Sequence, residues 1–238
     1  MYVLHNVLKY NNERNKMIER DLTNNIKEAL DGFPVLSITG PRQSGKTTLI
    51  KNCFKDFEYI NLEDPAIRKL AESSPTNYVK SFENNVIFDE AQYVPDIFSA
   101  IQVVVDDSNR KKKFILSGSQ NFLLLKNITQ SLAGRVCLFK LFPLSFNELY
   151  KHDNNIMIID AILKGGYPGL YNTKIKRNVF FNNYLETYVQ RDVAGYLDVR
   201  NTRDFKKFII LLASRAGQLI NYSDLSKNIG VDVRTIKE

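Results

Sequence analysis

Two patterns of apolar residues alternate along the first 141 positions of the chain. Apolar residues four positions apart predict an amphipathic helix over residues 17–30, which Asp31-Gly32 would end. Helical spacing returns after Thr47, from Pro65 onward and over 97–105. Between the helices, short and almost wholly apolar runs predict strands at 33–39, 57–62, 86–88, 113–116 and 136–141. Strands of this kind, alternating with helices, are typical of an α/β fold with a parallel sheet covered on both faces.

The pattern changes after Pro143, where only helical spacing is left. The sequence GGYPG at 165–169 breaks this region, and long aromatic-rich helices are predicted over 179–196 and 202–213. We therefore expect a domain boundary between residues 143 and 150.

The last residues resemble the opening of a helix-turn-helix. A helix over 222–229 is followed by a turn at Gly230, and Asp232 is a candidate cap for a second helix. Because the chain stops after about one and a half turns of that helix, at 3.6 residues per turn, we expect this last segment to be truncated. The expected division is a leader at 1–16, an α/β domain at 17–145, a helical domain at 146–213, and the start of a helix-turn-helix or winged-helix domain at 214–238.

Composition excludes several classes of protein. With 238 residues, of which 44% are hydrophobic and 25% charged, the chain has globular usage and room for two domains. It lacks a run of about 18 uncharged apolar residues, and its first residues do not resemble a secretory signal, so we expect a cytoplasmic protein without a membrane partner. The two cysteines, Cys53 and Cys137, and the two histidines form no zinc-ligand spacing; both thiols are expected to be buried and inert.

The formal net charge of +7 indicates an anionic partner without identifying it. Much of the excess lies between residues 164 and 207, a range that contains nine Lys or Arg residues and four acidic residues. A DNA or protein partner is therefore expected at the basic C-terminal half.

The glycine-rich run from Gly40 to Thr47 is the most specific motif in the chain. It matches GxxxxGK[ST], with a predicted strand before it and a helix after it, which is the context that a phosphate-binding loop requires. Backbone N–H groups and the helix N-terminus would surround the phosphates, Lys46 would reach the β- and γ-phosphate oxygens, and Thr47 would bind Mg²⁺. The alternative is a chance glycine-rich turn. The expected nucleotide-binding residues are Gly40, Pro41, Arg42, Gln43, Ser44, Gly45, Lys46, Thr47 and Thr48.

The apolar strand at 86–88 ends in Asp89-Glu90, as a Walker B strand does. Asp89 would hold Mg²⁺, usually through water, and Glu90 would polarise the attacking water as a general base. On their own these residues fit a solvated acidic turn equally well, and the loop upstream favours the catalytic interpretation. A further strand and helix separate the loop from Asp89, as in P-loop ATPases that carry an additional catalytic Glu.

Six segments in their order and spacing resemble the prokaryotic AAA-type P-loop ATPases that end in a domain of unknown function, relatives of the STAND signalling ATPases. These segments are GPRQSGKTT, VIFDEAQ, FILSGSQ, SLAGR, LFPLSFNEL and YVQRDV, and the resemblance covers residues 17–238. It implies an ASCE-type P-loop NTPase with a five-stranded parallel sheet of order 5-1-4-3-2, ATP as the nucleotide, and a winged-helix-like segment after the ATPase core. It also implies that residues 17–145 are the AAA-type ATPase domain. The leader at 1–16 has no counterpart in this family.

The resemblance also implies two further catalytic residues. The fourth strand would lie between the first and third, so that its end faces the γ-phosphate; Ser119 or Ser117, with Gln120 as third choice, would position the water. The alternative is a turn whose serines cap a helix. Arg135 matches the family's GR motif and would stabilise transition-state charge, in cis or from a neighbouring subunit, so oligomerisation is open. A structural salt bridge is its alternative.

These residues favour an Mg²⁺-dependent ATPase that couples hydrolysis to movement of a C-terminal partner-binding or DNA-binding domain. The competing interpretation is a nucleotide-gated switch or DNA-binding regulator with little turnover. A small-molecule kinase is disfavoured, because Asp89 is not expected on the strand next to the phosphate loop.

Overall fold

The computed structural model describes residues 17–119, 131–188 and 202–237. They contain a five-stranded sheet in the order β2-β3-β4-β1-β5, in which every neighbouring pair is parallel. This is the expected order, and it confirms the predicted α/β class. The strands are β1 (Val35–Thr39), β2 (Glu58–Asn61), β3 (Val86–Asp89), β4 (Phe114–Ser117) and β5 (Val136–Lys140).

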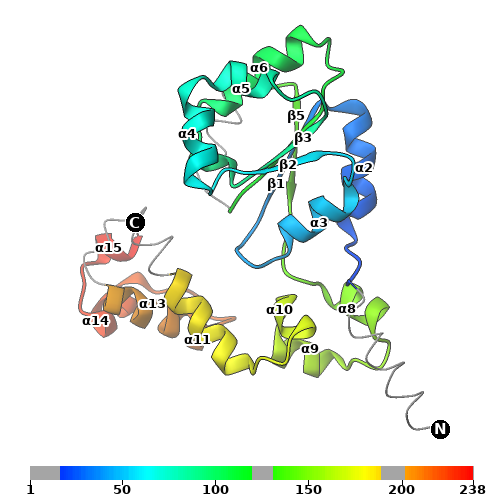
Figure 1. Ribbon diagram of the computed structural model, residues 1–238. Helices are drawn as coiled ribbons and strands as arrows, with labels where there is room; N and C mark the ends of the chain where they lie inside the picture. The colour runs from blue at the N-terminus through cyan, green and yellow to red at the C-terminus, as the bar shows by residue number, and fades with distance from the viewer. Residues whose placement is uncertain (1–16, 120–130, 189–201, 238) are drawn as a thin grey trace, which may run out of the picture. The chain divides into compact units, whose positions relative to one another are not determined.

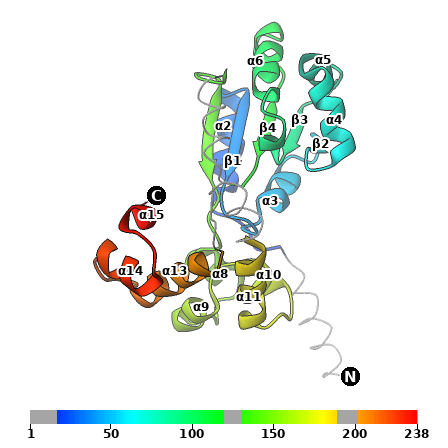
Figure 2. The same cartoon turned by 90° about the vertical axis from the view of Figure 1, so that its left-hand side faces the viewer.

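Helices cover both faces of this sheet (Figures 1 and 2). One face carries α2 (Leu22–Gly32) and α3 (Lys46–Cys53), and the other carries α4 (Pro65–Ser73), α5 (Pro75–Lys80) and α6 (Ile97–Asp107). A short 3₁₀ helix, η1 (Ala91–Tyr93), follows β3. After β5 come α8 (Phe146–His152), α9 (Ile158–Lys164) and α10 (Gly169–Asn172).

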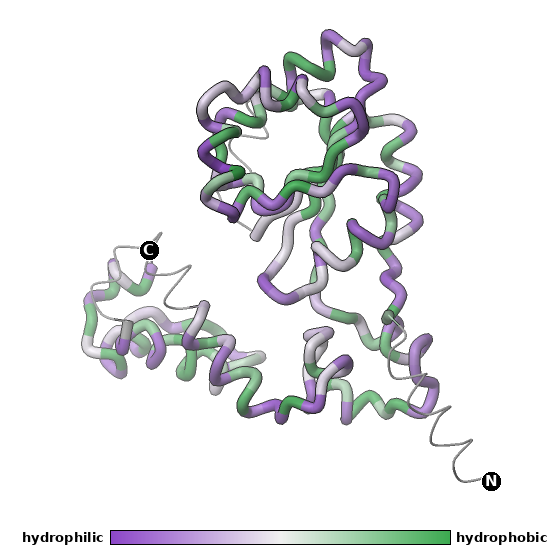
Figure 3. The backbone as a smooth tube through the Cα atoms, in the orientation of Figure 1, coloured by the Kyte–Doolittle hydropathy of each residue, from purple (hydrophilic) through white to green (hydrophobic). Residues whose placement is uncertain are grey.

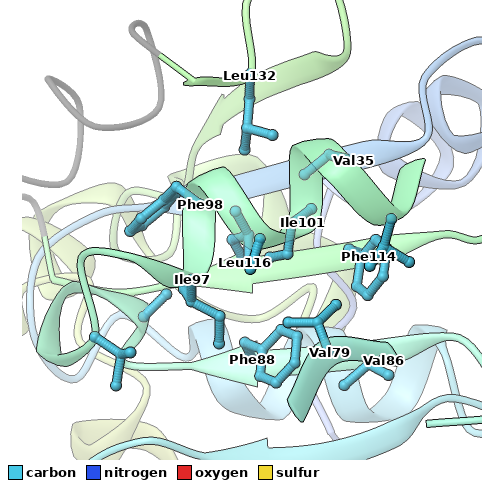
Figure 4. Close-up of a cluster of buried hydrophobic side chains, with 14 of the residues drawn as sticks. Val35, Val79, Val86, Phe88, Ile97, Phe98, Ile101, Phe114, Leu116 and Leu132 are labelled. Carbon is cyan, nitrogen blue, oxygen red and sulfur yellow. The ribbon is translucent and has the colours of Figure 1, made fainter. Parts of the chain in front are cut away.

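The period-two geometry of the strands explains why both faces of the sheet are apolar. Val86 and Phe88 of β3 pack toward α5 and α6, whereas Ile87 between them packs toward α2 and α3. Phe114, Ile115 and Leu116 of β4 alternate in the same way. Figure 4 shows the first of these clusters, and Figure 3 shows that apolar residues gather along the strands. Strands buried on both faces therefore appear as continuous apolar runs.

The chain divides into two compact units, residues 1–174 and 175–238. The second unit contains α11 (Arg177–Tyr188), α13 (Thr202–Ser214), α14 (Tyr222–Ile229) and α15 (Val233–Lys237). The helix predicted over 222–229 is present, and Gly230 ends it in the left-handed conformation with φ of 87°. Residues 189–196, the end of the predicted helix at 179–196, lie outside the described residues. The expected domain division stays a prediction.

The structure differs from the predictions at two elements. The first helix begins at Leu22 instead of residue 17, because the segment before it makes tertiary contacts: the Asp21 amide donates to Glu148 Oε1 at 2.9 Å. The structure also contains α5, which no prediction covered, with Pro75 in its first turn. Among the described residues, no helix combines the length and apolarity needed to cross a membrane.

Both cysteines are half-buried free thiols, so the expectation that they are buried was only partly right. Desolvation is the main cause that raises the pKa of the Cys53 thiol, which disfavours the reactive thiolate.

Candidate functional site

The phosphate-loop motif lies between β1 and α3, at the carboxyl edge of the sheet. Gly40 has a φ of 148°, and a Cβ built there would lie 2.1 Å from the Leu141 carbonyl oxygen. Gly45 has a φ of 94° directly before α3. Glycine is required at the first position by space and by conformation, and at the second by conformation. The loop therefore has the backbone that its motif predicts.

Lys46, the first residue of α3, is 93% buried in the loop. Its Nζ donates hydrogen bonds of 3.0 Å to the carbonyl oxygens of Gly40 and Pro41, and only 7% of the residue is exposed. The ammonium group is thus held against the loop backbone, at the N-terminal end of a helix. Both features place positive charge where an anion would bind.

The other expected loop residues differ in exposure. Ser44 is fully buried, and its Oγ has no partner among the described residues. Arg42 is half-buried, Gln43 is exposed with a φ of 59°, and Thr48 is exposed on α3. Gln43 and Gly45 both have positive φ, which bends the loop backbone on either side of Ser44.

Asp89 ends β3 and connects the loop with the neighbouring strands. Its Oδ2 accepts hydrogen bonds of 2.7 Å from Thr47 Oγ1 and from the Tyr59 hydroxyl. Its Oδ1 accepts from Ser117 Oγ and, at 3.1 Å, from the Glu90 amide. Asp89 is 4% exposed, and these four hydrogen bonds compensate for the burial of its carboxylate oxygens. The structure thus brings the predicted Mg²⁺ ligands together.

Glu90 lies beside Asp89 with a backbone that few residues other than glycine adopt. Its φ is 53° and ψ 44°, and its Oε2 accepts a hydrogen bond of 2.5 Å from Gln92 Nε2. The same Nε2 lies 3.5 Å from Ser119 Oγ, two residues after the end of β4. Gln92 therefore connects the candidate base with the candidate water-positioning serine. Gln120 lies outside the described residues.

Arg135 lies at the opposite edge of the sheet from the phosphate loop. Its carbonyl accepts from the Val35 amide at the start of β1, whereas the loop follows the end of β1, about 15 Å further along at 3.3 Å per residue. Its guanidinium makes two hydrogen bonds of 2.7 Å to the Asp106 carboxylate. This position does not bring Arg135 to the phosphate loop of its own chain, and the two bonds to Asp106 fit the structural salt bridge.

The side-chain oxygens of Thr47 and Asp89, at the phosphate-loop edge of the sheet, fit a magnesium ion. Mg²⁺ prefers carboxylate and hydroxyl oxygens and is usually completed by phosphates and water, and Thr47 and Asp89 supply one of each kind within hydrogen-bonding distance. In the described ranges, no three His, Cys, Asp or Glu side chains come together as a protein-only metal site.

Three residues of the site were missed by the sequence analysis. Tyr59 stood in an apolar strand, and Gln92 ended the segment VIFDEAQ without an assigned role, so neither residue carried a functional signal of its own. Arg20 was placed inside the first helix, although its guanidinium donates a hydrogen bond of 2.8 Å to the Ser44 carbonyl in the phosphate loop. Contacts across such sequence separations carry no local pattern.

We expect Tyr59 to make stability sensitive to alkaline pH. Burial, followed by the hydrogen bond to Asp89 and the nearby negative charges, raises the Tyr59 pKa well above 10. Between 10 and that higher pKa the unfolded chain loses a proton that the folded protein retains, so the free energy of unfolding falls as pH rises. Urea unfolding at several pH values above 10 should give a smaller decline for Tyr59→Phe than for the parent. Equal slopes would contradict this.

The fold and the site together define a P-loop NTPase. Its strand order is that of the ASCE type, in which β4 lies between β1 and β3. The strand that carries Asp89 is separated from β1 by β4, which disfavours the kinase alternative. Residues 32–150 match the family model described as an AAA domain, and residues 156–238 match a domain of unknown function. The chain belongs to the AAA domain family, which supports nucleotide binding in general.

Uncharacterised relatives match most of the chain, and a solved structure shares its fold. An uncharacterised protein of Mycobacterium tuberculosis is 29% identical over 225 residues, covering 92% of this chain and 49% of that protein. One from Methanocaldococcus jannaschii is 29% identical over 219 residues, covering 80% and 48%. The chain thus spans about half the length of these curated relatives. The Walker-type ATPase of Pyrococcus abyssi shares the fold with a TM-score of 0.51, at 16% identity over 90% of this chain and 89% of that one.

Proposed function

We propose that this protein binds ATP and hydrolyses it to ADP and phosphate in an Mg²⁺-dependent reaction. The observation that carries the proposal is the pairing of Thr47 with the buried Asp89 at 2.7 Å, beside a phosphate loop and next to Glu90. A solvated acidic turn, the alternative for Asp89-Glu90, would leave the aspartate exposed.

Each part of the site would have a separate task. The loop N–H groups and the α3 N-terminus would bind the β- and γ-phosphates, and Lys46 would exchange its bonds to Gly40 and Pro41 for phosphate oxygens. Thr47 and Asp89 would hold Mg²⁺, which when bound neutralises phosphate charge. These residues bind and orient the substrate.

Glu90 would accept the proton of the attacking water, and Ser119 would position that water. The Gln92 amide group bonds to the Glu90 carboxylate and lies within 3.5 Å of Ser119 Oγ. This arrangement supports a shared role for Glu90 and Ser119. Proton transfer of this kind contributes about 10² to 10⁴ in rate. Arg135 would stabilise the transition state from a neighbouring subunit.

A phosphate-release assay tests the proposal. The parent protein should release phosphate from ATP with Mg²⁺ and not with excess EDTA, and Lys46→Ala should lower the rate by about 10² or more, because a positioned cation at the developing charge is lost. Lys55→Ala, at an exposed position after α3, is the matched control and should keep the parent rate.

The same assay separates the competing function. Tight ATP binding without phosphate release by the parent would overturn the enzyme and favour a nucleotide-gated switch. The observation that favours this second candidate is the pair α14 and α15, two helices joined by a turn at Gly230, as in a DNA-binding helix-turn-helix. Arg234 and Lys237 of α15 would then face an anionic partner. In both cases we propose that the nucleotide state of the site controls the position of a C-terminal domain that binds such a partner.

A further inference from the structure

Arg20 is a buried arginine whose guanidinium reaches three separate segments. Its Nη1 donates 2.8 Å to the Ser44 carbonyl in the phosphate loop, and its Nη2 donates 2.6 Å to the Phe142 carbonyl beyond β5. Its Nε donates 2.9 Å to Glu148 Oε1 in α8. The residue is 9% exposed. So many directed bonds from one buried cation indicate a fixed position.

The contact with Ser44 determines the orientation of one peptide in the loop. The peptide between Ser44 and Gly45 is planar and trans, so its N–H points away from its carbonyl oxygen. Because Arg20 holds that oxygen, the Gly45 N–H is directed away from Arg20. Gly45, with its φ of 94°, directly precedes α3, where loop N–H groups bind phosphate. Without Arg20, this peptide can rotate, since glycine offers little resistance.

Glu148 balances the charge of Arg20 and extends the connection into α8. The ion pair has side-chain exposures of 7% and 5%, and the same Oε1 accepts the Asp21 amide. Glu148 Oε2 accepts from the Ser145 amide, while Ser145 Oγ accepts from the Glu148 amide, which forms a capping box at the start of α8. A chain of buried bonds therefore runs from the loop backbone to the first turn of α8.

We propose that Arg20 is a positioning residue that orients the Ser44–Gly45 peptide for phosphate binding and links occupancy of the loop to the first turn of α8. The inference rests on the proposed function, because it requires the loop to bind the phosphates of a nucleotide. A bound phosphate fixes the same peptide that Arg20 fixes. Nucleotide and the Arg20–Glu148 pair would therefore stabilise one another.

A merely structural role for Arg20 predicts a different result. If the guanidinium only joined α8 to the rest of the unit, its loss would lower stability and leave the affinity of the folded protein for nucleotide unchanged. Orientation of the loop peptide predicts a loss of affinity in a protein that is still folded. Affinity measured well below the unfolding temperature therefore separates the two roles.

The test uses Arg20→Met combined with Glu148→Gln, so that no buried charge is left unpaired and the capping box keeps a suitable residue. We expect the Kd for Mg-ADP, measured by equilibrium titration, to rise at least about tenfold, which corresponds to about 1.4 kcal/mol. Arg20→Lys keeps the charge but lacks the planar guanidinium, so the Kd of this variant for Mg-ADP should also be higher than that of the parent. Lys151→Met is the matched control: it removes a 60% exposed cation that pairs with Asp21 and does not contact the loop.

Hydrogen exchange supplies an independent readout on the parent chain. Saturating Mg-ADP should slow exchange of backbone amides at 144–150 in the parent and have no such effect in the double variant. A folded variant that binds Mg-ADP within about twofold of the parent would overturn the role of Arg20, as would parent amides that do not respond to Mg-ADP. A parent that binds neither Mg-ADP nor Mg-ATP would instead contradict the proposed function itself.

Discussion

Glu90→Gln is expected to lower the rate of steady-state ATP hydrolysis strongly while ATP still binds. The amide keeps the size of the side chain and a hydrogen-bonding oxygen for Gln92, but it cannot accept a proton from water. The rate should fall by about 10² to 10⁴, the usual contribution of a general base. Affinity should persist, because the loop, Lys46 and the Thr47–Asp89 pair are unchanged. Single-turnover phosphate release and an ATP titration measure the two quantities separately.

Glu83→Gln is the control for this substitution. It makes the same chemical change at an exposed position just before β3, so both affinity and rate should match the parent. If Glu90→Gln kept a rate within a few fold of the parent, Glu90 would not be the base. If it lost affinity together with rate, Glu90 would act in binding instead.

Gly40→Ala is expected to cause the largest loss of stability among single changes in the loop. An added Cβ would meet the Leu141 carbonyl oxygen at 2.1 Å, and φ is 148°. The Leu141 amide donates 2.8 Å to the Thr39 carbonyl, so the clashing oxygen belongs to a backbone that is itself held by β1. Strain at such a position costs about 1–3 kcal/mol before any clash is counted. Urea unfolding should therefore show a decrease of about 3 kcal/mol or more.

Gly45→Ala is the comparison that separates the steric cost of an added Cβ from the cost of a positive φ. A Cβ there would have its nearest neighbours, Arg20 Nη1 and Pro168 Cγ, at 3.6 Å, which is ordinary contact. Only the cost of its φ of 94° is left, about 1–2 kcal/mol. Equal losses for the two variants would contradict the close approach of Gly40 to Leu141. Nucleotide affinity should fall in both, since both change the direction of loop N–H groups.

The sheet was predictable because its central strands, β1, β3 and β4, are buried on both faces. Runs such as 86–88 and 114–116 contain no polar residue, and the helices between them have clear spacing. Element ends were less predictable: the helix expected from residue 17 begins at Leu22, because tertiary bonds to Glu148 hold Asp21 outside it. The strand order came from family resemblance, since local patterns do not encode which strands pair.

The site was predictable where its residues are adjacent in sequence. Lys46 and Thr47 follow from the loop motif, and Asp89 from the strand that it ends. The support around them was not: Tyr59 reaches Asp89 from β2, and Gln92 reaches both Glu90 and Ser119. These contacts depend on which strands are neighbours, so they follow only after the fold is known. Arg135 is the opposite case. The family motif implied a catalytic role for it, but the structure places its side chain against Asp106, away from the phosphate loop.

The close approach of Gly40 to Leu141 has a consequence for the order of events during synthesis. Residues 35–39 find their sheet partners only in 114–117 and 136–140, and Arg20 finds Glu148 128 positions later. A ribosome therefore completes the phosphate loop early, but two of the groups that shape it, at Leu141 and Glu148, emerge much later. Pairings this distant form slowly because a long loop must close first. We infer that the nascent chain gains affinity for nucleotide only after α8 has been synthesised.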